Sequence, residues 1–296
     1  MSFSPTDATF EGFRVVRRAP LTILFWSLIY LAAFAVTFIA VGPSLAGLMA
    51  MAERMQGAEP GFAEFEALGR AFGWIFGVAA PIMLAMGAVL NAAVARSVLR
   101  PSEKAFGYVR VGADELRVLA TTLILSLVIF VLTMGLYLVL ALLGFAAYSS
   151  GQGWLWLIVV LGALAAIGLV VWLSVRWSLA VPIAMAEKRI APFASFALTK
   201  GRFWPLLGMA LLAGVMSILV SLLASIVAMP VTLIVGDMDK LAAYEGQNVL
   251  TILTGAWPLL LGWTIVNAVT TSLQLAVMYA PFSAAYLAIK GQTAEA

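Results

Sequence analysis

The amino-acid sequence of 296 residues contains no cysteine and no histidine, and charged residues make up only 10% of it. Without cysteine the chain has neither a disulfide nor a thiolate nucleophile, and without histidine it has no imidazole base. The commonest zinc ligands are missing with them. A soluble domain carries about 25% charged residues, because polar side chains must cover its surface. These absences exclude an ordinary soluble domain, most metal sites and every thiol or imidazole mechanism.

Apolar residues, in contrast, make up 64% of the chain, and the mean hydropathy is +1.06. The charged residues delimit five uncharged runs of 34, 25, 58, 34 and 44 residues, which follow Arg18, Arg70, Arg117, Arg202 and Glu245. One helix crosses a bilayer with about 20 apolar residues. The run of 58 residues is too long for one crossing. Its polar break at residues 148–153 has the serine and glycine content of a tight turn.

We therefore expect a single all-α transmembrane domain over residues 1–296, a polytopic bundle of about six transmembrane helices with interfacial amphipathic helices. The predicted spans cover approximately residues 21–42, 71–95, 118–147, 154–181, 204–235 and 256–287. The connection at 43–70 carries several glutamates and is expected to lie on the membrane surface as a short amphipathic segment. A carboxylate-lined vestibule or cation site is the alternative for this connection.

Lysine and arginine are distributed asymmetrically over this topology. Thirteen of the 17 fall on the side that holds the N-terminus, three fall on the other side, and Arg176 lies within a predicted helix. The positive-inside rule therefore predicts that both termini are cytoplasmic. Tryptophans near both ends of the helices fit aromatic belts: Trp74, Trp154, Trp156 and Trp257 at the outer ends, and Trp26, Trp172, Trp177 and Trp204 towards the inner ends.

Small residues recur on two of the predicted helices. Ser217, Ser221 and Ser225 follow one another every fourth residue, and Gly73 and Gly77 have the same spacing. Such faces let helix backbones approach closely in a membrane, where no hydrophobic effect separates a helix from lipid. We expect internal helix packing at both faces, and a dimer interface is the alternative.

Arg176 is the only charged residue well inside a predicted crossing, close to its inner end. A long basic side chain there extends to the headgroup region. The functional alternative is that Arg176 contacts a lipid phosphate together with Lys200 and Arg202. No acidic residue within the crossings is available to pair with it.

Three amides, Asn91, Asn267 and Gln274, lie within the predicted crossings. An unsatisfied amide in hydrocarbon is costly, so we expect hydrogen bonds across helices. A substrate path lined by the three residues is the alternative. Because no crossing contains Asp, Glu, Lys or His, a proton-coupled pump is disfavoured.

Motifs of catalysis are missing as well. The sequence has no Gly-rich phosphate loop, no Gly-x-Ser-x-Gly elbow and no histidine-based triad. The basic residues are explained by membrane topology and not by nucleic-acid binding. We therefore predict no enzymatic activity, no catalytic residue, no metal, no cofactor and no nucleic-acid partner.

Three stretches carry a resemblance to a known family: residues 175–182, VRWSLAVP; residues 198–204, LTKGRFW; and residues 108–117, YVRVGADELR. They resemble the six-helix bacterial membrane proteins of the YciC-like group and the membrane domain found beside glycerophosphodiester phosphodiesterases. The resemblance implies an α-helical protein of the bacterial inner membrane. It implies no catalytic residue, since the phosphodiesterase itself uses histidines and metal-binding carboxylates on a separate barrel.

Arg17, Arg117 and Arg202 precede alternate helices, which suggests three related helical hairpins. The first hypothesis for function is a non-catalytic membrane protein that binds or organises lipid in envelope homeostasis. It rests on the basic and aromatic segments of the cytoplasmic side. A transporter or channel for a small solute or lipid is the second hypothesis. The third is a scaffold for a membrane-protein partner or a second copy of the chain.

Overall fold

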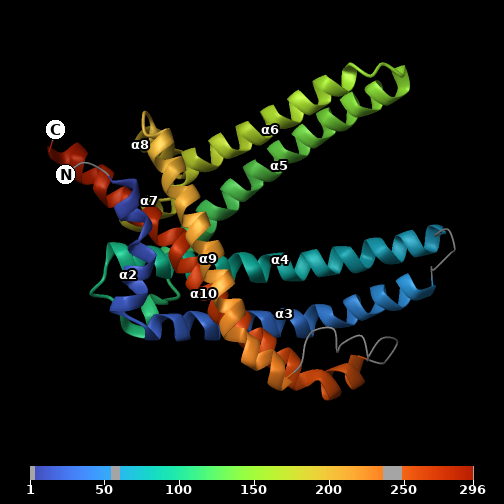
Figure 1. Ribbon diagram of the computed structural model, residues 1–296, viewed down its shortest axis with the longest axis horizontal. Coiled ribbons are helices and arrows are strands. Elements are labelled where there is room, and N and C mark those ends of the chain that lie inside the picture. The colour runs from blue at the N-terminus through green and yellow to red at the C-terminus, as the bar shows by residue number, and fades with distance from the viewer. Residues whose placement is uncertain (1–3, 55–60, 236–248, 296) are drawn as a thin grey trace.

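The long apolar runs form six long helices in the computed structural model, which describes residues 4–54, 61–235 and 249–295 (Figure 1). They are α3 (Leu21–Arg54), α4 (Phe62–Leu99), α5 (Ala113–Ser150), α6 (Leu155–Trp177), α9 (Phe203–Val235) and α10 (Val249–Glu295). Each contains a stretch long and apolar enough to cross a membrane. No strand occurs within the described ranges. The structure therefore confirms an all-α, multi-pass membrane protein.

Six shorter helical elements connect or precede the long ones. They are α1 (Pro5–Thr9), α2 (Glu11–Arg18), η1 (Ala105–Tyr108), α7 (Ala180–Glu187), η2 (Pro192–Ala194) and α8 (Ser195–Thr199). We call these short elements, with the adjoining ends of the long helices, the base. Both α1 and the last part of α10 belong to it, and the two helices are in contact.

Three helical hairpins extend from the base, and we call them the arms: α3–α4, α5–α6 and α9–α10 (Figure 1). The α3–α4 and α5–α6 arms diverge from each other, while α10 contacts α9, α3, α4 and α2. The α5–α6 turn is made as expected, because Gly151 ends α5 in the left-handed conformation at φ 68°. Three hairpins are thus present, as the spacing of the arginines suggests.

Several helices extend beyond their predicted limits. The segment before residue 71 does not form a separate surface helix, because it is the continuous beginning of α4. Likewise α3 continues past Pro43 to Arg54, and α10 continues past Pro258 and Pro281 to Glu295. Transmembrane helices tolerate proline when neighbouring groups satisfy the freed carbonyl. Glu59 of the predicted surface segment lies outside the described residues.

The buried core lies in the base and not along the arms. Trp26 at the start of α3 is fully buried, and its Nε1 donates a hydrogen bond to the Gly107 carbonyl oxygen at 2.8 Å. Trp177 is buried as well. The expected place of these two tryptophans in an aromatic belt is therefore wrong, because tertiary packing encloses them. The other six tryptophans named above are exposed: Trp74, Trp154, Trp156, Trp172, Trp204 and Trp257.

Two glycines permit this close packing. A Cβ on Gly12 of α2 would lie 2.5 Å from the carbonyl oxygen of Ala276 in α10. Gly107 adopts φ 65°, a conformation that favours glycine, and a Cβ there would lie 2.9 Å from the Cβ of Phe25. Only glycine therefore lets α2 and η1 approach the long helices this closely.

Candidate functional site at the junction of the hairpins

The arms expose most of their apolar side chains. In the most apolar stretch of α5 no residue is buried, and in that of α6 only 6% are buried, compared with 33% in α4. Leu127 and Phe130 of α5 and Leu157 and Leu161 of α6 are among the exposed side chains. A lipid bilayer is the solvent in which such surfaces are stable.

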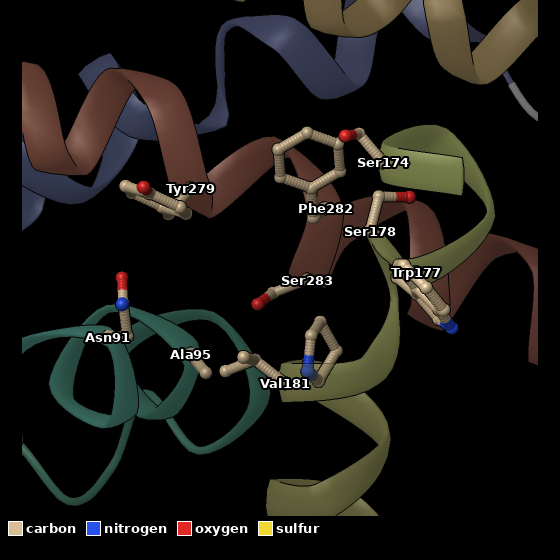
Figure 2. Close-up of a pocket in the computed structure, with 10 residues that line it drawn as sticks. Asn91, Ala95, Ser174, Trp177, Ser178, Val181, Tyr279, Phe282 and Ser283 are labelled. Atoms are coloured by element: carbon tan, nitrogen blue, oxygen red, sulfur yellow. The ribbon is translucent and has the colours of Figure 1, made fainter. Parts of the chain in front are cut away.

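Where the arms meet, the structure contains a cavity of about 240 Å³ (Figure 2). One helix of each arm contributes to its wall: α4, α6 and α10, joined by α7. Its lining consists of Asn91, Ala95, Ser174, Trp177, Ser178, Val181, Pro182, Tyr279, Phe282 and Ser283. In the cavity, residues of all three hairpins therefore face a common space.

Exposure of the lining residues differs between the two ends of the cavity. The helices α4, α6 and α10 all run towards the base, so the lining residues with the lower numbers in each lie farther out. On α6 this outer residue is Ser174 and on α10 it is Tyr279, and both are exposed. The inner residues Trp177 and Ser283 are buried. The lining is therefore more exposed at its outer end, towards the arms, than at its inner end.

Asn91 and Ser283 are polar side chains of the cavity that have unused hydrogen-bonding capacity. Asn91 Oδ1 is buried without a hydrogen-bond partner. Ser283 is buried, and its hydroxyl has no hydrogen bond to the described part of the chain. In Figure 2 both side chains extend into the space between α4 and α10. Buried polar atoms are normally paired, so an unpaired acceptor at a cavity indicates a place for a ligand or water.

The other polar groups of the lining are differently placed. Ser174 and Ser178 donate to carbonyl oxygens of their own segment, those of Val170 and Val175, each at 2.8 Å. Trp177 Nε1 is buried without a partner, but it points away from Asn91 in Figure 2. Asn91 and Ser283 are therefore the groups best placed to bind something in the cavity.

Below the cavity the base contains a network of ion pairs. Arg96 is 1% exposed, forms an ion pair with Glu115, and donates from Nη1 to the Tyr108 carbonyl oxygen at 2.6 Å. Arg100 reaches Asp114 at 3.0 Å and the Met185 carbonyl oxygen at 3.0 Å. The network joins the end of α4 to η1, to the start of α5 and to α7. Arg96 and Arg100 therefore hold the base together. The sequence does not predict this role, because both residues fit the basic pattern of a cytoplasmic loop.

Arg176 is also engaged within the protein. Its Nη1 donates to the Phe196 carbonyl oxygen and to Thr199 Oγ1, each at 3.3 Å. The guanidinium lies 5.4 Å from the ring centres of both Trp172 and Phe196. Ser195 Oγ in turn donates to the Arg176 carbonyl oxygen at 2.6 Å. These contacts fasten α8 to the end of α6.

Lys200 and Arg202 follow directly after α8, so the structure brings all three predicted headgroup residues to one part of the base. Lys200 is exposed and Arg202 is half-buried. Within residues 4–54, 61–235 and 249–295 neither side chain has an ion pair or hydrogen bond. Of the three, Lys200 and Arg202 are therefore the ones free to contact an external anion.

The three predicted amides do not share one path. Asn91 lines the cavity, whereas Asn267 is exposed and donates to the Trp263 carbonyl oxygen of its own helix at 2.9 Å. Gln274 Nε2 donates to the Ser217 carbonyl oxygen across the α9–α10 contact at 3.3 Å. Gln274 thus makes the kind of bond between helices that the sequence analysis expects.

The small residues differ between the two predicted faces. Ser217 is half-buried at the α9–α10 contact, but Ser221 and Ser225 are exposed. Gly73 and Gly77 are exposed, and a Cβ on either would have no described atom of another helix within 4 Å. Internal packing is therefore found only near Ser217, because α4 diverges from the other arms over its outer half.

Outside the membrane-spanning segments, α1 and α2 are joined by an exposed ion pair. Arg14 donates to the Asp7 carboxylate and holds the pKa of Asp7 below its usual range. The same contacts, with Glu11 at 3.2 Å, raise the pKa of Arg14. In the described ranges no group of acidic side chains could hold a metal ion.

Comparison with protein-family models, with curated proteins and with solved structures finds no match. The fold and the cavity therefore define the class of this protein: a multi-pass membrane protein of three helical hairpins that diverge from a buried base. The stretches that carry the sequence resemblance, at 108–117, 175–182 and 198–204, all lie in or beside the base.

Proposed function

We propose that this is a non-catalytic, lipid-binding protein of a bacterial inner membrane, with a role in envelope homeostasis. In this proposal lipid lies between the arms, and one polar end of a lipid enters the cavity at their junction. The single observation that carries the proposal is the cavity itself, which lies between helices of all three hairpins.

The exposure of the arms supports this role. Much of the apolar surface along α5 and α6 is not covered by the described part of the chain. In a bilayer, acyl chains would cover these surfaces and extend to the cavity mouth at Ser174 and Tyr279. Small-molecule pockets usually measure about 300–1,000 Å³. At about 240 Å³ the cavity is suited to one end of a lipid whose chains remain outside.

The charge distribution supports the proposed orientation and a second, weaker contact. Most lysines and arginines lie on the side of the base, which the positive-inside rule assigns to the cytoplasm. The free cations Lys200 and Arg202 would contact anionic headgroups, at about 1 kcal/mol each. Exposed Trp204 beside them is suited to the headgroup region.

Filling the cavity tests the proposal. The wild-type protein, extracted with its surrounding membrane and then exchanged into mild detergent, is expected to retain lipid, measured by mass spectrometry. Ala95→Phe places a ring at the cavity wall and should remove that lipid. Ala165→Phe, on the exposed surface of α6, is the matched control and should not. Equal lipid retention by the two variants, with unchanged thermal unfolding, would contradict the proposal.

A further inference from the structure

We propose that the cavity binds the free hydroxyl group of an uncharged lipid of the diacylglycerol type, and not a phosphate-bearing headgroup. This inference rests on the proposed function and specifies its ligand. It begins with the charge of the lining: none of the ten residues that form the cavity wall is ionisable to a cation or carries a negative charge at neutral pH.

The neighbouring cations are already engaged. Arg96 follows Ala95 of the lining, but it is bound by Glu115 and by the Tyr108 carbonyl oxygen. Arg176 precedes Trp177 but does not itself line the cavity. Its Nη1 donates to the Phe196 carbonyl oxygen and to Thr199 at the contact with α8, and its buried Nε has no hydrogen-bond partner. A phosphate that entered the cavity would lose its hydration without gaining a cation, which is strongly unfavourable.

Asn91 and Ser283 fit a hydroxyl group instead. The buried Asn91 Oδ1 needs a donor, and the Ser283 hydroxyl can both donate and accept. A lipid hydroxyl placed between them would donate to Asn91 and accept from Ser283. Figure 2 shows the two side chains directed into the same space from opposite walls, α4 and α10. A small neutral group that bridges the two side chains would satisfy both.

The rest of the lining fits the adjoining part of such a lipid. Ala95, Val181, Pro182 and Phe282 give an apolar wall for the glycerol carbons. The exposed residues Ser174 and Tyr279 mark the side on which the acyl chains would leave. A diacylglycerol has its hydroxyl and its chains at opposite ends, as this geometry requires.

Two photoreactive lipids with identical chains test the inference. One is a diacylglycerol and the other the corresponding phosphatidic acid, so that they differ only in the phosphate. Each is incorporated into nanodiscs with the wild-type protein, irradiated, and its adducts are located by peptide mass spectrometry. With the photoreactive group close to the glycerol, we expect diacylglycerol to label the cavity residues at least about tenfold more than phosphatidic acid.

Variants make the outcome specific. Asn91→Leu keeps the size of the side chain and should lower diacylglycerol labelling of the cavity by about tenfold. Ser283→Ala should lower it as well, and it provides a second test should Asn91→Leu fail to fold. Asn267→Leu, which changes an exposed amide on the same helix as Ser283, should leave labelling unchanged.

The remaining outcomes separate the inference from the proposed function. Equal labelling of the cavity by both lipids would overturn the hydroxyl inference and leave lipid binding supported. Labelling of the arms alone, with none in the cavity, would overturn the inference. Water, and not a lipid hydroxyl, would then be the partner of Asn91 and Ser283. The loss of retained lipid in Ala95→Phe, measured separately, decides whether the proposed function fails too.

Discussion

The base and the arms of this protein are stabilised in different ways. In the base, Arg96 is buried with Glu115, Trp26 is fully enclosed, and α2 touches the backbone of α10 at Gly12. Along the arms, apolar side chains are exposed and glycines such as Gly73 have no helix against them. The base is thus specified by contacts within the chain, whereas the arms depend on the bilayer. The cavity lies at the boundary between the two regions.

The largest expected effect is the loss of the buried arginine of the base. Arg96→Ala leaves Glu115 buried without its partner, which should cost about 3–5 kcal/mol of stability. Thermal unfolding in detergent, followed by circular dichroism, should show a much lower midpoint. Arg110→Ala removes a half-exposed arginine from the same network and is the control. Equal shifts for the two variants would mean that the base is not held by this buried pair.

A pair of glycine substitutions tests the difference in packing. Gly12→Ala adds a Cβ that would lie 2.5 Å from a backbone oxygen of α10, so α2 must move, at about 1–3 kcal/mol. Gly73→Ala adds the same atom to an open part of α4 and should have little effect on stability, or a small favourable one. Both are measured by thermal unfolding. A destabilising Gly73→Ala would show that the face of α4 that carries Gly73 is packed against another part of the protein.

A third prediction compares free and engaged cations. The double change Lys200→Gln and Arg202→Gln should weaken retention of anionic phospholipid by about 2 kcal/mol, roughly thirtyfold in affinity, with the fold intact. Lys104→Gln with Lys188→Gln removes the same charge from other exposed positions of the base. Anionic lipid retained by each purified double variant is measured by mass spectrometry. An equal loss in the two double variants would indicate a general effect of charge and contradict a local site at Lys200 and Arg202.

The smallest expected effect concerns the exposed pair of Asp7 and Arg14. The pKa of Asp7 is lowered by Arg14 in the folded protein. Its contribution to stability is therefore present above the unfolded value of 3.8 and is lost as pH falls through the lowered folded value. Asp7→Asn should lower the unfolding midpoint slightly at neutral pH, by an amount that vanishes in acid. A difference that stays constant with pH would exclude this ion pair as its cause.

The sequence predicts the helices well because their chemistry is local. Uncharged runs mark all six crossings, and Gly151 lies in the predicted turn of the α5–α6 hairpin. Helix ends are less predictable, because helix formation continues past charged residues and past Pro281. Among the polar residues of the crossings, the sequence also identifies Asn91, whose amide has few partners in an apolar segment.

Other parts of the site depend on tertiary structure. Ser283 is one of many serines, and only the approach of α10 to α4 places it in the same cavity wall as Asn91. Arg96 fits the positive-inside pattern of headgroup contacts, although it is buried with Glu115. Adjacent acidic residues at 114 and 115, shortly after Arg96 and Arg100, were the available signal. No local sequence pattern predicts that the arms diverge. The spacing of Gly73 and Gly77 therefore predicts a helix contact at a face of α4 that is exposed in the structure.

A structure determined in lipid nanodiscs, with a bound antibody fragment to aid cryo-electron microscopy, would show directly whether lipid occupies the junction of the arms. We expect acyl-chain density between the arms, continuous with a small polar group that lies against Asn91 and Ser283. It would be contradicted by arms that close on one another, with protein side chains filling the cavity and no lipid at the junction.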